Sequence, residues 1–245
     1  MPKIGLQLYT IREITEKDFF GALRRVAQIG YDGVEFAGYH GAAADDLKSL
    51  LDDTGLEAAG AHIGVDVAEK DLPNQIAYAS AIGCPALVVP GFWGVDYNRT
   101  TFERMADLFN RAGERCRAAG LRFLYHIHGH EFVDIGGQIG MDLLFERTDP
   151  ALVAFEPDTY WVEHAGVNAV EFAARHGARC PYFHLKDTRS REPFRDTEIG
   201  DGVIDIAGVI RAAPQAEWLI VEQEAFDRPP MESIQISFQN IRKMV

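Results

Sequence analysis

Short apolar runs alternate with amphipathic segments along the whole chain. Each run has the length and the continuous apolar character of a strand that is buried on both faces of a parallel sheet. The segments between them place apolar residues at helical spacing, as in Phe19, Leu23 and Val26. The pattern predicts strands near residues 3–8, 33–37, 57–62, 86–90, 121–127, 152–157, 181–185 and 217–222.

The order of these elements predicts an eight-fold α/β barrel. Helix-sized crossovers join parallel strands, and eight strand–helix units with nothing left over close most simply into a (β/α)8 TIM barrel. The length of 245 residues fits that fold, which typically has about 250. An open doubly wound sheet normally has a glycine-rich phosphate loop after its first strand, whereas this chain continues as QLYTIRE at 7–13. No linker is evident, so we expect one domain, residues 1–245.

Polar, metal-capable side chains recur where the apolar runs end. Burying an unpaired charge is costly, so repeated strand ends of this kind suggest one site at the mouth of the barrel, where the active sites of this fold lie. The side chains are those of Glu35, His62, His126, His128, Asp158, His184 and Glu222.

Asp158, His184 and Glu222 end the last three predicted strands and suit a divalent cation such as Mn²⁺, Mg²⁺, Co²⁺ or Zn²⁺. A fourth ligand should come from the fifth strand or its loop, where Glu131, His126 and His128 are candidates. The alternative is a structural cluster of hydrogen-bonded polar side chains.

Other residues at the strand ends are candidates for contacting a substrate. His126 and His128 are two positions apart and so face the same way on a strand. Glu35 and His62 should line the opposite side of the mouth. Lys186 could neutralise a developing oxyanion or a substrate carboxylate, or form a structural salt bridge to Glu224 or Asp187.

Aromatic side chains and two long connections should shape the mouth. Trp93 and Trp161 lie just beyond strand ends, where they could stack against a sugar ring or simply cap the core. The segments 91–100 and 187–205 both follow strands. Long loops on this face are often lids, and ordinary surface excursions are the alternative.

The charge and cysteine content narrow the class of protein. The net charge of −13 repels phosphate backbones and disfavours nucleic-acid binding. No apolar stretch approaches the ~20 residues that cross a membrane, and the first residues do not resemble a signal peptide. Three cysteines without a CxxC pair fit reduced thiols. We expect a cytoplasmic protein, and homo-oligomerisation stays open.

The motifs GLQLYTIRE, GYDGVEF, YHIHGHEF, FEPDTYW, YFHLKD and IVEQE resemble, in order and along the whole chain, the xylose-isomerase-like sugar phosphate isomerase/epimerase family. The resemblance implies a TIM barrel with one divalent metal ion and a sugar, cyclitol or related polyol as substrate. By position, Asp158, His184 and Glu222 match metal ligands of the family. His126 stands where many members have a glutamate ligand, and Glu131 could supply that carboxylate. Trp161 stands where ketose epimerases have a histidine.

The resemblance implies isomerase or epimerase chemistry through an enediolate. Such a reaction needs a base beside the substrate C–H bond, and Glu131, Glu222 and His128 are the candidates. The alternative enzyme classes are a dehydratase or lyase acting on a keto-sugar, keto-inositol or oxidised glycoside, and an abasic-site endonuclease. A non-catalytic sugar-binding protein also stays open, because fold alone does not decide function.

Overall fold

The computed structural model describes all 245 residues. Eight parallel strands form one sheet in the order β6-β5-β4-β3-β2-β1-β10-β7. Every predicted strand is present within two residues of its expected bounds, and the predicted TIM barrel is confirmed. The strands are β1 (Lys3–Gln7), β2 (Gly33–Phe36), β3 (Glu57–His62), β4 (Ala86–Val89), β5 (Arg122–Ile127), β6 (Val153–Pro157), β7 (Tyr182–Leu185) and β10 (Trp218–Val221).

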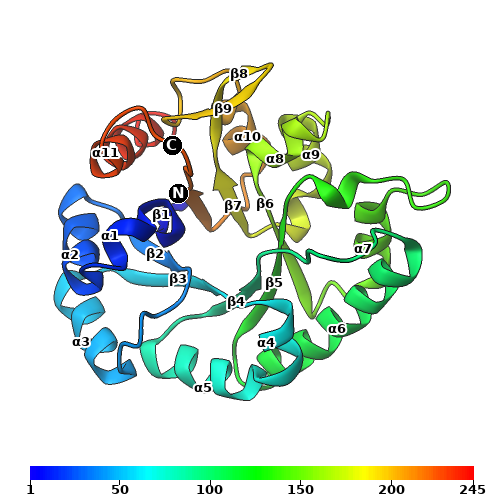
Figure 1. Cartoon of the computed structure of the whole chain (residues 1–245), viewed down its shortest axis with the longest axis horizontal. Helices are drawn as coiled ribbons and strands as arrows, with labels where there is room; N and C mark the ends of the chain where they lie inside the picture. Colours follow the sequence, from blue (N-terminus) through cyan, green and yellow to red (C-terminus); the bar gives the residue numbers. More distant parts are fainter.

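The helices surround the ring of strands, as Figure 1 shows. None of them is both long enough and apolar enough to cross a bilayer. Short 3-10 turns occur at Leu8–Ile11, His130–Phe132 and Gly177–Arg179. The α-helices are α1 (Arg12–Thr15), α2 (Phe19–Ile29), α3 (Ala44–Thr54), α4 (Val65–Lys70), α5 (Leu72–Ile82), α6 (Arg99–Ala118), α7 (Gly140–Arg147), α8 (Thr159–His164), α9 (Ala169–His176), α10 (Ile206–Ala212) and α11 (Pro230–Ile241).

The barrel is joined unevenly around its circumference. Seven neighbouring pairs of strands are joined by parallel ladders, for example Leu124 with Ala154 and Ile220 with His184, and one of them, β2 with β3, shifts register between Val34 and Glu35. Between β6 and β7 there is only an isolated bridge, Asp158 with His184. The hydroxyl of Thr159 adds a link there, because it donates to the Lys186 carbonyl at 2.7 Å and accepts from the Lys186 amide at 2.9 Å.

The core has two parts, which follow from the two-residue alternation of a strand. Outward-facing side chains pack under the helices in a cluster of 61 buried residues. The inside of the barrel has a smaller cluster of seven, including Leu124, Tyr182, Trp218 and Ile220. A Cβ on Gly33 would lie 2.6 Å from the Trp218 ring, so glycine there makes room for the indole that fills the base of the barrel.

The same alternation changes from apolar to polar toward the mouth. Leu124 is followed two positions later by His126, Tyr182 by His184, and Ile220 by Glu222. Because these positions share one face of a strand, the apolar base of the barrel carries a polar upper layer. That layer is fully or almost fully buried, since His126, His184 and Glu222 are 1, 0 and 8% exposed.

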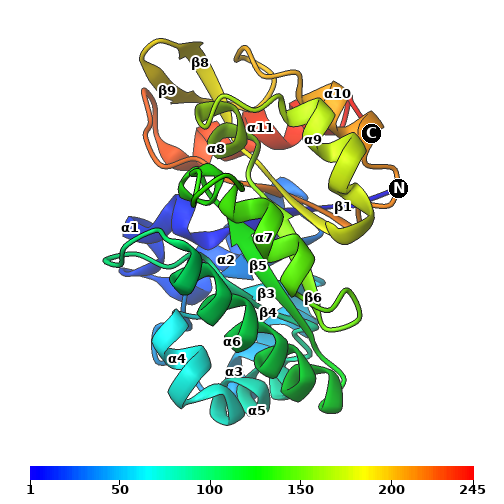
Figure 2. The same cartoon turned by 90° about the vertical axis from the view of Figure 1, so that its right-hand side faces the viewer.

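The long segment after β7 forms a two-stranded antiparallel hairpin, β8 (Asp187–Arg191) and β9 (Phe194–Thr197). It stands above the barrel rim near α8 and α11 (Figure 2). Arg191 binds Glu163 of α8 at 2.8 Å, and Arg195 binds Asp227 at 2.5 Å. The hairpin therefore connects the segments that follow β6 and β10.

Candidate metal and substrate site

Two overlapping groups of side chains at the mouth could hold a metal ion. Within each group the potential ligand atoms lie within 4.8 Å of one another. His126 and His184 belong to both groups. The first group adds Asp158 and Glu222, and the second adds His62 and Glu156.

The first group contains the three residues that the strand ends suggest, and His126 is its fourth member. His184 Nδ1 lies 2.6 Å from Glu222 Oε2. Asp158 Oδ1 caps α8 by accepting from the amides of Tyr160 at 2.8 Å and Trp161 at 3.2 Å. Asp158 Oδ2 is buried and has no hydrogen-bond partner. Two carboxylates and two imidazoles suit a divalent transition metal, and the free oxygen leaves a lone pair for such an ion.

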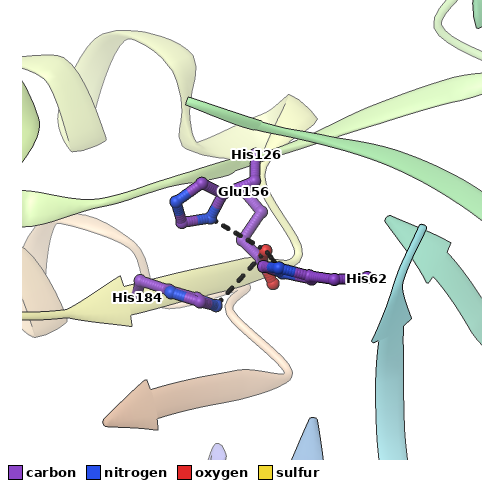
Figure 3. A group of neighbouring side chains, drawn as sticks. All are labelled: His62, His126, Glu156 and His184. Carbon is purple, nitrogen blue, oxygen red and sulfur yellow. Dashed lines mark hydrogen bonds and ion pairs between the residues drawn. The ribbon is translucent and has the colours of Figure 1, made fainter. Parts of the chain in front are cut away.

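The second group centres on Glu156, which we did not single out from the sequence. Figure 3 shows His62, His126 and His184 surrounding its carboxylate. Glu156 Oε2 lies 3.0 Å from His126 Nδ1 and 3.3 Å from both His62 Nε2 and His184 Nε2. The available signal was the spacing, because Glu156 precedes Asp158 by two positions and so shares its face of the strand.

Glu35 closes the polar layer from the β2 side. Its Oε2 atom lies 2.6 Å from His184 Nε2 and 3.0 Å from His62 Nε2, and it accepts from the Gln7 amide at 2.7 Å. Glu35 is fully buried and does not line the cavity. The structure thus brings Glu35 and His62 together with His184 rather than on a separate side of the mouth.

Burial and ion pairing shift the pKa values of these groups in different directions. Burial alone would raise the pKa of Glu35, but His62 and His184 hold it well below its ordinary value. Burial opposes protonation of His62, and the carboxylates of Glu35 and Glu156 nevertheless raise its pKa to about 9. Burial raises the pKa of Glu156 to about 7, with a further contribution from Glu35. The polar layer therefore contains carboxyls that differ strongly in acidity.

Glu131 lies outside both groups. The 3-10 turn at His130–Phe132 directs its carboxylate to the hydroxyl of Tyr125, which donates to Glu131 Oε1. Tyr125 faces the helices and stacks on Phe109. Burial raises the pKa of Glu131 to about 7. The structure does not bring Glu131 to Asp158, His184 and Glu222.

A cavity of about 920 Å³ opens above the polar layer. The predicted residues His62, His126, His128, Trp93, Trp161 and Glu222 line it. His128 Nδ1 is buried without a hydrogen-bond partner, and burial lowers the pKa of this imidazole to about 3. The imidazole is therefore neutral at pH 7 and has a free nitrogen.

The two long connections contribute differently to this cavity. The segment after β4 supplies Trp93 and Tyr97 to its wall, and Trp93 is 57% exposed. No residue of the β8–β9 hairpin lines the cavity. Tyr9, which follows β1, completes the aromatic wall and is 44% exposed. Aromatic faces of this kind can stack on the apolar face of a sugar or cyclitol ring.

Lys186 does not line the cavity. It is 1% exposed and its ammonium group binds Glu224. The ammonium lies 4.9 Å from the centre of the Tyr160 ring and 5.1 Å from that of Trp161. Of the two salt bridges considered from the sequence, the structure contains the one to Glu224.

Comparison with known proteins places the chain among related barrels. The family model described as xylose isomerase-like TIM barrel matches residues 23–244. An inosose dehydratase from Geobacillus kaustophilus is 28% identical over 244 residues, which cover 82% of this chain and 79% of the relative. An inosose dehydratase from Lacticaseibacillus casei is 25% identical over 264 residues, covering 91% and 85%.

Solved structures show the same fold. A sugar phosphate isomerase/epimerase from Parabacteroides distasonis superposes with a TM-score of 0.85 and 24% identity, covering 98% of each chain. An L-ribulose 3-epimerase superposes with a TM-score of 0.77 and 16% identity, covering 100% of this chain and 94% of the other.

Proposed function

The chain belongs to the xylose isomerase-like TIM barrel family, and from this premise we propose that it removes a proton next to the carbonyl of a keto-cyclitol or keto-sugar. One observation carries the proposal. The group formed by His126, Asp158, His184 and Glu222 reaches an aromatic-walled cavity through His126 and Glu222. His128, an imidazole with a free nitrogen, lines the same cavity.

One divalent ion fits Asp158, His184, Glu222 and His126, and Mn²⁺, Mg²⁺, Co²⁺ and Zn²⁺ are the candidates. The free Oδ2 atom of Asp158 supports this donor set. Glu131 fits less well as a ligand, because its carboxylate is bound by Tyr125. When bound, the ion would polarise the substrate carbonyl and stabilise the enediolate.

The protein's own side chains account for proton transfer and orientation. His128 is the first candidate for the base, because it lines the cavity and burial keeps its imidazole neutral. Glu222 is the second, since it also lines the cavity. Trp93 and Trp161 would hold the ring, while Glu35 fixes His62 and His184 in place.

Loss of water is the outcome we favour. The two curated relatives described above are inosose dehydratases, and this chain covers 79% and 85% of their lengths. Elimination needs an acid for the departing hydroxyl in addition to the base. His62 lines the cavity and is held between Glu35 and Glu156, so it is the candidate for that acid.

Isomerisation or epimerisation is the second candidate. His62 ends β3 and His128 follows β5. Two side chains that could transfer a proton therefore come from different strands of the barrel. An intermediate reprotonated by either of them would give an isomer or an epimer instead of losing water. Dehydration and isomerisation or epimerisation would share the same first step, removal of the proton next to the carbonyl.

The deciding experiment is incubation of the Mn²⁺-loaded protein with an inosose in D₂O, followed by NMR and mass spectrometry. Loss of water, together with deuterium at the carbon that carried the departing hydroxyl, would support the dehydratase. Incorporation of deuterium without elimination of water would support the isomerase or epimerase. No exchange with an inosose or with a panel of ketoses would contradict the proposal.

His128→Gln and Glu222→Gln separate the two candidate bases. Loss of exchange in only one of them would identify the base, provided that the variant still binds one metal ion per chain by elemental analysis. Glu217→Gln is a matched control, because Glu217 pairs with Arg122 at the opposite end of the barrel and both are exposed.

A further inference from the structure

The lining of the cavity contains no arginine and no lysine. Its carboxylates are those of Glu222, on the side of the candidate metal ligands, and Glu224, two residues further along the chain after β10. The remaining wall is largely imidazole and aromatic, with Tyr9, Trp93 and Trp161 among its members. A substrate group that points outward from the ring therefore meets aromatic faces and one carboxylate.

Lys186, which lies next to this wall, is already engaged in a salt bridge. Lys186 is buried beneath Trp161 and Tyr160, and its ammonium binds Glu224. Asp196 of the β8–β9 hairpin is 4.0 Å from the same ammonium. The side chain of Glu224 is 38% exposed, whereas that of Lys186 is 2% exposed, so the pair presents its acidic member to solvent.

The backbone holds Glu224 in this position. The amide of Glu224 donates to Asp196 Oδ2 at 2.7 Å, and the amide of Ala225 donates to the same oxygen at 3.2 Å. The hairpin that carries Asp196 is in turn bound to Asp227 by Arg195. Glu224 is thus a fixed part of the wall rather than a freely moving surface residue.

The other nearby cations lie outside this cavity or are paired with carboxylates. Arg12 donates to the carbonyls of Tyr9 at 3.0 Å and Glu224 at 3.2 Å, and it lines a neighbouring cavity rather than this one. His62 is held between the carboxylates of Glu35 and Glu156. No cation of the wall is left to pair with an anionic substituent.

We infer that the cavity selects uncharged substrates over phosphorylated or carboxylated ones, and that the exposed carboxylate of Glu224 sets this selectivity. This inference rests on the proposed function, since it specifies the class of polyol or keto-sugar that the site accepts. A phosphate on the outer side of the ring would lose its hydration and face the Glu224 carboxylate, which is a repulsive arrangement. Removing the charge of Glu224 would remove this repulsion, while Lys186 would stay buried beside Asp196.

The test is calorimetric binding of myo-inositol and of a myo-inositol monophosphate, which share one ring, to the Mn²⁺-loaded protein. The wild type should bind the neutral ring at least tenfold more tightly than the phosphate. Glu224→Gln should reduce this ratio at least tenfold.

Glu217→Gln controls for the change in net charge, because it removes an exposed carboxylate at the other end of the barrel. A ratio that changes equally in Glu217→Gln and Glu224→Gln would overturn the inference. Equal binding of the two rings by the wild type would overturn it while leaving the proposed function intact. No binding of either ring, together with no deuterium exchange in the inosose and ketose assay, would overturn the proposed function and the inference with it.

Discussion

Asp158 and His184 form the single backbone bridge that joins β6 to β7. Both side chains also belong to one group of potential metal ligands. The strand pair with the least backbone pairing is therefore the pair whose ends carry two of the candidate ligands. The site and the closure of the barrel depend on the same residues, which makes substitutions there informative about both.

Asp158→Asn should separate the ligand role of this residue from its role as a helix cap. Asparagine still accepts from the Tyr160 and Trp161 amides, but it lacks the carboxylate charge. We expect Mn²⁺ affinity to fall by at least the roughly 10- to 100-fold that loss of a partner of a metal ligand costs. The free energy of unfolding without metal should not fall, because burial of a carboxylate with a pKa raised to about 7 is unfavourable. Titration with Mn²⁺ and urea unfolding measure the two effects.

Asp158→Ala provides the comparison, since it removes the cap as well as the charge. It should lower the free energy of unfolding by about 0.5–2 kcal/mol relative to Asp158→Asn. Unchanged Mn²⁺ binding in both variants would rule out Asp158 as a ligand.

Thr159→Val should weaken the join between β6 and β7. The Thr159 hydroxyl pairs with both the amide and the carbonyl of Lys186, and valine would leave these buried groups without that partner. The expected loss is about 1–3 kcal/mol in the free energy of unfolding. Thr100→Val, at an exposed position of α6, is the matched control. Equal stability of the two variants in urea would contradict this account.

Glu131→Gln should change how stability depends on pH. Burial raises the pKa of Glu131 from 4.5 to about 7, so the folded state binds a proton that the unfolded state has released. The contribution of this group to stability is therefore lost as the pH rises from about 4.5 through 7, by an amount on the order of 3 kcal/mol. Glutamine still accepts from Tyr125 and does not ionise, so this loss should disappear.

The measurement is urea unfolding of wild type and Glu131→Gln at pH 5 and pH 8. The variant should gain stability over the wild type as the pH rises. A difference between the two proteins that does not vary with pH would show that Glu131 ionises as easily folded as unfolded.

Trp93→Ala should weaken ligand binding with little effect on folding. The indole is 57% exposed at the mouth, and surface substitutions usually change stability by less than about 0.5 kcal/mol. Loss of an aromatic face costs about 0.5–1.5 kcal/mol in contact energy, which corresponds to a roughly 3- to 10-fold weaker affinity. Calorimetry with myo-inositol measures the change. Trp93→Phe should retain most of the affinity, and tight binding by Trp93→Ala would argue against stacking.

The strand pattern was enough to predict the fold, because each strand is a short apolar run with polar residues at its end. It was also enough to bring Asp158, His184 and Glu222 into one group, since neighbouring strands of a barrel end side by side. These predictions needed only the two-residue alternation and the order of the elements.

The positions of Glu131 and Glu156 could not be obtained in this way. Glu131 follows β5 by four residues, and a 3-10 turn decides that its carboxylate meets Tyr125. The spacing from Asp158 places Glu156 on the inner face of its strand, but its importance follows from three imidazoles that come from β3, β5 and β7. Both outcomes depend on contacts between segments that are far apart in the sequence, which no local pattern specifies.

The sparse pairing between β6 and β7 has a consequence for the lifetime of the protein in a cell. Segments that open most readily are the ones proteases reach first, and the strand pair with the fewest paired residues is expected to open before the others. Any ligand that contacts both Asp158 and His184 would tie the two strands together and lower the open population. Resistance to limited proteolysis between residues 158 and 184 would then report how fully the site is occupied. A ligand-free molecule would be degraded sooner than a ligand-bound one.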